Sequence, residues 1–201
     1  DLWTPSWQWA APPPGVAAPQ ALAPAVRSRF DQAVLKIVKS GDAAAAHDLH
    51  ELSLGLAAGT ENAPQRAFWS LAAGYFQAVS LGLVPSDLYA KRMASRVLTQ
   101  YAALARGEPL PSERLAQDLL FYCARAVPPV GVQAEALAAV RAAHGVEQAE
   151  AVDYEDRRFG RFDPAQLAQA RKRVTAASET WSALAGGDTH QLKPALEQFH
   201  L

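Results

Sequence analysis

Cysteine is almost absent from this sequence, since Cys123 is the only one among 201 residues. A single thiol can form neither an internal disulfide nor a cysteine-rich zinc site, so a reducing compartment such as the cytoplasm is expected. Cys123 ends the apolar stretch 119–123. That setting is typical of a small buried core residue rather than of a reactive thiol.

An excess of charge of either sign is also lacking. The 19 basic and 20 acidic residues give a formal net charge of −1. Nucleic acids and anionic lipids bind clustered Lys and Arg, so we expect neither as the main partner. Residues 67–86 are uncharged over the length of a membrane span, but Gln, Ser and Gly interrupt them and Pro85 closes them. We expect a buried helix there and no membrane insertion.

Catalytic motifs are missing as well. The sequence contains neither a Gly-x-Ser-x-Gly nucleophile elbow nor a Gly-x-x-x-x-Gly-Lys phosphate loop. The acidic residues of 153–156 lie beside the arginines of 157–161, and paired surface charges explain them without an active site. We therefore expect no enzyme activity, no catalytic residue, no bound metal and no cofactor.

Helical periodicity is what the sequence does contain. Half of the residues are apolar, and they recur at every third or fourth position between glycines and prolines. This pattern predicts helices over about 24–41, 43–57, 64–79, 86–107, 111–127, 132–144 and 163–186. In the fourth, a stripe of Tyr89, Met93, Val97, Tyr101 and Leu104 is expected to face the core. The predicted fold class is an all-α multi-helix bundle spanning 24–201, with two sub-bundles, 24–108 and 109–201, as the alternative.

Residues 1–23 differ in kind and are predicted to form a proline-rich arm. The run Pro12-Pro13-Pro14 blocks helix formation and favours extended backbone. Trp3, Trp7 and Trp9 precede it, and tryptophans so closely spaced are too apolar to remain in water. We expect them to pack either on the bundle itself or on a protein partner, and they are the candidate partner-binding residues. Because the chain begins at Asp1 rather than Met, we also expect it to be part of a longer protein.

Histidine is the residue type that can carry chemistry at neutral pH. His47 and His50 are neighbours on one helix face, and Glu51 lies one turn beyond His47. A metal ion would need further ligands, and the other three histidines are isolated along the sequence, so these residues do not predict a metal site.

Three stretches, residues 112–124, 152–164 and 169–188, together resemble a known family. They are similar to the N-terminal region of the chemotaxis-type hybrid histidine kinases (ChpA/PilL-like) that control type IV pili and twitching motility, and to the related FimL scaffold proteins. The resemblance implies a degenerate fold of the histidine-phosphotransfer (Hpt) type. It also implies a cytoplasmic scaffold that binds protein partners of a pilus chemosensory complex and other domains of its parent chain.

The same resemblance provides a test for phosphotransfer. A phosphotransfer helix reads His-x-x-Lys-Gly, in which the Lys steadies the phosphoryl charge. After His50 the third position is Ser53, and the glycine, Gly55, comes one place late. After His47 the fourth position is Glu51, which would repel phosphate. The sequence therefore predicts a non-catalytic scaffold module, with a phosphorelay through His50 as the alternative. A small-ligand sensor is a third interpretation, for which closely packed Ala-rich helices leave little room.

Overall fold

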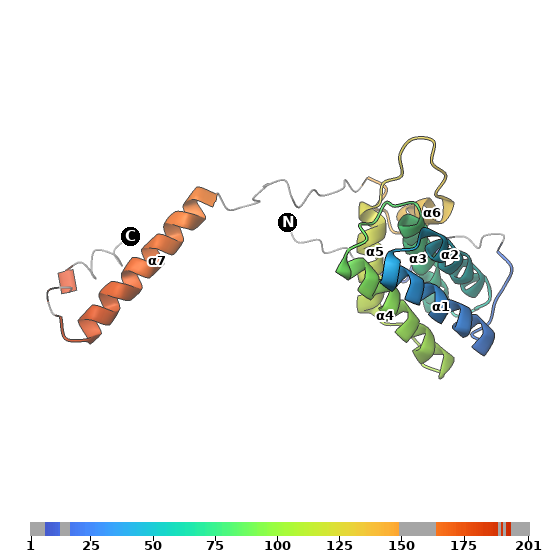
Figure 1. Cartoon of the computed structure of the whole chain (residues 1–201), viewed down its shortest axis with the longest axis horizontal. Coiled ribbons are helices and arrows are strands. Elements are labelled where there is room, and N and C mark those ends of the chain that lie inside the picture. Colours follow the sequence, from blue (N-terminus) through green and yellow to red (C-terminus); the bar gives the residue numbers. More distant parts are fainter. Residues whose placement is uncertain (1–6, 13–16, 149–163, 189, 191, 194–201) are drawn as a thin grey trace. The chain divides into compact units, whose positions relative to one another are not determined.

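The computed structural model describes residues 7–12, 17–148, 164–188, 190, 192 and 193. These residues form seven helices, and no strand occurs among them, which confirms the predicted all-α class. The chain divides into two compact units (Figure 1), one holding α1 to α6 up to Val152 and the other holding α7. The helices are α1 (Pro24–Ser40), α2 (Ala43–Ala58), α3 (Ala63–Ser80), α4 (Leu88–Ala105), α5 (Glu113–Arg125), α6 (Glu135–Ala143) and α7 (Pro164–Ala185).

Short polar side chains start four of these helices. Asp42, Asn62, Asp87 and Ser112 each accept a hydrogen bond from the backbone N–H three residues further on. Such N-caps satisfy one of the donors that a helix start leaves unpaired. The expectation that Ser86 begins α4 is wrong by one residue, because the Asp87 carboxylate holds the Ala90 N–H at 2.8 Å.

Helix α3 is the centre of the first unit. It packs against α2, α5 and α6, while α1 packs against α2 and α4. Helices from both sides of Pro109 therefore share one unit, and the boundary between units falls after Val152 rather than near residue 109.

An aromatic cluster fills the middle of this unit. Phe30 lies 5.6–6.1 Å, centroid to centroid, from the rings of Trp69, Phe76 and Tyr101. All four side chains are buried, and each contributes about 1.5–3 kcal/mol through removal of its apolar surface from water. The Tyr101 hydroxyl donates to the Ala23 carbonyl at 2.9 Å, so the same cluster fixes the point where the arm enters α1.

A buried arginine joins α5 to α6. The Arg141 guanidinium donates to the carbonyls of Cys123, Ala124 and Ala126 at the end of α5, and to the Glu147 carbonyl at 2.9 Å. A positive charge at a helix C-terminus stabilises carbonyls that have no partner within the helix. The connection after α5 is therefore held by polar contacts as well as by apolar packing.

The inward stripe predicted for α4 needs one correction. Met93, Val97, Tyr101 and Leu104 are buried as expected, but Tyr89 is 66% exposed. Its position on the inner face is taken by Ala90, which is small enough to lie close to the Tyr75 hydroxyl.

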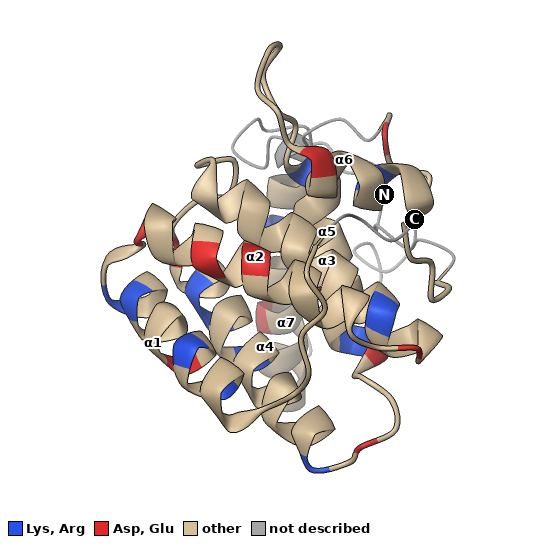
Figure 2. Cartoon of the chain, turned by 90° about the vertical axis from the view of Figure 1, so that its right-hand side faces the viewer, with Lys and Arg blue, Asp and Glu red and all other residues tan. Residues whose placement is uncertain are grey.

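Charge is distributed unevenly over the helices (Figure 2). Helix α1 carries four basic residues and one acidic residue, whereas α2 carries Asp48 and Glu51 and no Lys or Arg. The near-zero net charge of the whole chain therefore hides local regions of opposite sign.

The second unit is described only through α7 and six residues beyond it, 186–188, 190, 192 and 193. In α7 the apolar residues Leu167, Val174 and Trp181, which recur at helical spacing, are exposed. The predictions that concern Trp3, the charged residues of 153–161 and the start of the last helix at residue 163 fall outside the described residues.

Candidate functional site

The His47–His50 pair lies on the face of α2 that turns toward α3 and α6. The two rings are 5.8 Å apart, and His50 is only 5% exposed. His50 Nδ1 lies 3.0 Å from the Ala73 carbonyl of α3. A carbonyl can only accept, so Nδ1 carries the proton and a neutral ring presents its Nε2 lone pair.

The Nε2 atom faces a carboxylate rather than a phosphate-binding cation. Glu51 Oε1 is 3.6 Å from it, and burial lowers the pKa of His50 below the usual 6.5. A phosphoryl group placed on Nε2 would meet the negative charge of Glu51 inside a partly closed space. These surroundings weigh against the phosphotransfer alternative.

His50 borders a pocket of about 570 Å³ between α2, α3 and the start of α6, with Pro12 and Ala17 of the arm also in its lining. Polar groups of Ser70, Gln77 and Glu135 share its lining with apolar side chains such as Leu54 and Ala136. The expectation that Ala-rich helices leave little room is wrong here. The pocket lies where the start of α6 meets α2 and α3, and not in the contact between α2 and α3 themselves.

Trp7 and Trp9 pack against the core of the first unit and are half-buried. Their rings meet edge to face at 5.1 Å, and Trp7 stacks on His144, at the end of α6, with centroids 5.7 Å apart. His144 also makes a hydrogen bond to the Ala10 backbone, and burial lowers its pKa. The structure thus gives Trp7 and Trp9 an intramolecular role, and their binding of a partner stays a prediction.

The rest of the described arm crosses α2 at two glycines. Gln20 N–H donates to the Gly55 carbonyl at 2.9 Å. A Cβ placed on Gly59 would lie 1.9 Å from the Gln20 carbonyl oxygen, and one on Gly55 would lie 2.8 Å from Gln20 Cγ. Glycine is required at residue 59 because another segment's backbone occupies the space of a side chain, not because of its own backbone angles.

An exposed strip on α4 combines apolar and basic side chains. Leu88 is 59% exposed and Tyr89 66%, and Arg92 follows them one turn later on the same face. Tyr and Arg are the side chains that most often dominate binding energy in protein interfaces. This α4 strip, defined as Leu88, Tyr89 and Arg92, was missed at the sequence level because Tyr89 was assigned to the core.

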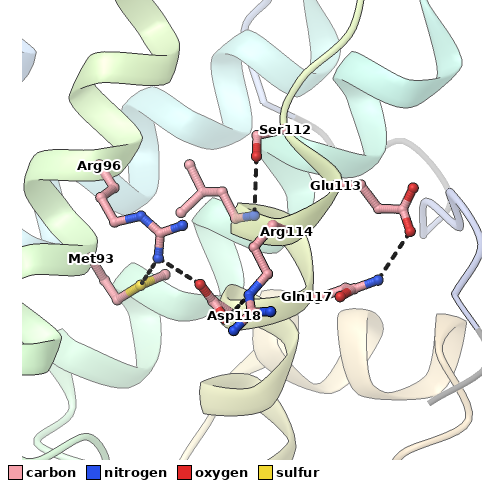
Figure 3. A network of polar contacts seen from close by, with 8 residues as sticks. Met93, Arg96, Ser112, Glu113, Arg114, Gln117 and Asp118 are labelled. Atoms are coloured by element: carbon pink, nitrogen blue, oxygen red, sulfur yellow. Dashed lines mark hydrogen bonds and ion pairs between the residues drawn. The ribbon is translucent and has the colours of Figure 1, made fainter. Parts of the chain in front are cut away.

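One turn beyond the strip, an ion pair joins α4 to α5 (Figure 3). Asp118 accepts a hydrogen bond from Arg96 of α4 at 2.5 Å and forms an ion pair with Arg114 of α5 at 3.4 Å. Arg96 also lies 3.6 Å from the sulfur of Met93, so its guanidinium is fixed over the α4–α5 junction. The strip therefore lies on a helix that polar contacts join to its neighbour, and not in a loop.

Cys123 is fully buried, as the sequence predicted. Burial raises the pKa of its thiol to about 12, so the nucleophilic thiolate is not formed at neutral pH.

In the described part of the chain, no group of three or more His, Cys, Asp or Glu side chains is arranged to hold a metal ion. None of the helices in that part combines the length and apolarity needed to cross a membrane.

A family model described as the FimL scaffold protein second domain matches residues 15–157. The match covers 143 of the 201 residues and includes all of α1 to α6. No curated protein and no solved structure matches the chain.

Proposed function

Because this chain belongs to the family of FimL scaffold protein second domains, we propose that it is a non-catalytic scaffold module of a bacterial two-component chemosensory system. In this proposal the module works in the cytoplasm, and its system controls type IV pili and twitching motility. The family match over residues 15–157 is the observation that carries the proposal, since it spans every helix of the compact first unit.

The α4 strip is the surface on which we expect a protein partner to bind. Leu88 and Tyr89 provide apolar surface that a partner would bury on binding. Arg92 can donate charge-assisted hydrogen bonds to a partner's carboxylates. A scaffold needs such a preformed surface on rigid elements, because binding to ordered groups costs less conformational entropy.

The experiment replaces the chromosomal copy and measures the twitching zone beneath agar in a host with type IV pili. We expect loss of the protein to reduce twitching and the wild-type chain to restore it. The variant Tyr89→Ala/Arg92→Glu should restore it poorly, because it removes the strip without touching the core. The control Leu35→Ala/Arg29→Glu likewise changes one exposed apolar and one exposed basic residue, on α1, and should restore it fully. Unaltered twitching after loss of the protein would refute the proposed function.

The alternative, a phosphorelay through His50, requires a separate test. The protein is incubated with a radiolabelled phosphorylated kinase or receiver domain, and acid-labile phosphate is measured on it. We expect no label, since His50 is buried beside Glu51. Label on the wild type that disappears in His50→Gln would establish the phosphorelay instead.

A further inference from the structure

The pocket beside His50 has polar groups arranged in a way that the scaffold function does not use. At one end, two hydrogen-bond acceptors lie next to each other: His50 Nε2 and Glu51 Oε1, separated by 3.6 Å. The His50 ring proton is already engaged on the other side by the Ala73 carbonyl. Two acceptors at this distance repel unless a donor lies between them.

The charges around the pocket select the sign of a ligand. Glu51 and Glu135 both line it, and α2, which forms one wall, has no Lys or Arg. Arg66 is the basic residue of the lining, and its guanidinium donates to the carbonyls of Thr60 and Glu61. A cation is therefore favoured over an anion in this space.

The shape and the remaining lining set the size and the polarity of the ligand. A volume of about 570 Å³ falls within the range of small-molecule sites in proteins. Leu54, Ala57 and Ala139 provide apolar walls, and the Ser70 hydroxyl, in a residue only 7% exposed, provides a polar group deep in the lining. The lining thus fits a molecule with a short carbon chain and a polar end.

We propose that this pocket binds a small organic amine, with its ammonium group between His50 Nε2 and Glu51 and its carbon chain along the alanine-rich wall. The ammonium donates one hydrogen bond to the imidazole lone pair and one to the carboxylate. A second amino group, where the ligand has one, is attracted by Glu135. The inference is independent of the proposed scaffold function, because it rests on the residues that line this pocket and not on the family match.

The test uses three probes of nearly equal length: 1,5-diaminopentane, 1,5-pentanediol and glutarate. Binding to the full chain is followed by isothermal titration calorimetry and by amide shifts in ¹H–¹⁵N NMR spectra. We expect saturable binding of the diamine, with shifts on α2 and α3 around His50 and Ser70. The diol and glutarate should bind at least tenfold more weakly, since neither carries a cationic donor.

Glu51→Gln is the decisive variant. The Glu51 side chain is 58% exposed, so the change preserves the fold while removing the charge. It should weaken diamine binding at least tenfold, whereas the matched control Glu61→Gln, in the loop before α3, should leave it unchanged. Equal binding of the diol, an unaltered affinity in Glu51→Gln, or diamine shifts confined to other acidic surfaces would overturn the proposal.

Discussion

The glycine at position 59 offers the sharpest test of how the arm is held. Gly59 ends α2 with a φ of −86°, an angle that alanine adopts freely. Helix propensity alone therefore predicts that Gly59→Ala stabilises the protein by about 0.5–1 kcal/mol. The position of Gln20 predicts the opposite, because the new Cβ would lie 1.9 Å from the Gln20 carbonyl oxygen.

The expected cost follows from what must move. A backbone carbonyl cannot rotate away as a side-chain end can, so the arm has to shift, and overpacking of this kind costs about 1–3 kcal/mol. The shift also weakens the Gln20 N–H to Gly55 carbonyl bond, which contributes about 1 kcal/mol. With the propensity gain subtracted, we expect Gly59→Ala to destabilise the protein by about 2 kcal/mol, or about 4–8 °C in Tm.

The assay is a double-mutant cycle with thermal unfolding followed by circular dichroism. Removing residues 1–20 removes the carbonyl that the methyl group meets, so in that shortened chain Gly59→Ala should be neutral or stabilising. Gly55→Ala should cost less than Gly59→Ala, since it meets only the flexible Gln20 side chain. A higher Tm for Gly59→Ala in the full chain, or the same cost with and without the arm, would refute this reasoning.

Three further predictions concern buried polar groups. Arg141→Met should lower the unfolding free energy by about 3 kcal/mol in urea titrations, because the carbonyls at the end of α5 lose their donor. Burial lowers the pKa of both His50 and His144 from 6.5, so the unfolded chain takes up protons first as the pH falls. Stability should therefore be full above pH 6.5 and decline as the pH falls through the native pKa values, and His144→Gln should flatten this decline. Cys123 should resist Ellman's reagent in the native protein and react after unfolding in urea, because burial raises its pKa to about 12.

The helices could be predicted because their signals are local. Asp42, Asn62 and Ser112 cap helices whose starts the sequence places within a residue or two. The burial of Cys123 followed in the same way from its apolar neighbours. The prediction that Tyr89 is buried was wrong because periodicity fixes only the spacing of an apolar stripe. An aromatic side chain at the edge of the stripe can lie in the core or on the surface. Ala90 rather than Tyr89 faces the core because a small residue leaves room for the Tyr75 hydroxyl. This contact joins residues fifteen positions apart.

The pocket and the arm contacts could not be predicted, for a related reason. The His50–Glu51 pair was visible in the sequence, but the wall opposite it comes from α6, more than eighty residues later.

Gly55 and Gly59 were visible too, as glycines near a helix end, where a cap is the usual explanation. A cap requires glycine for its backbone angles, whereas Gly59 is required for the space that its missing side chain leaves to Gln20. Glycine meets either requirement, so only the position of the crossing arm shows which of the two applies at residue 59. The arm must then be counted as part of the fold, and any partner that binds Trp7 or Trp9 has to compete with the core for them.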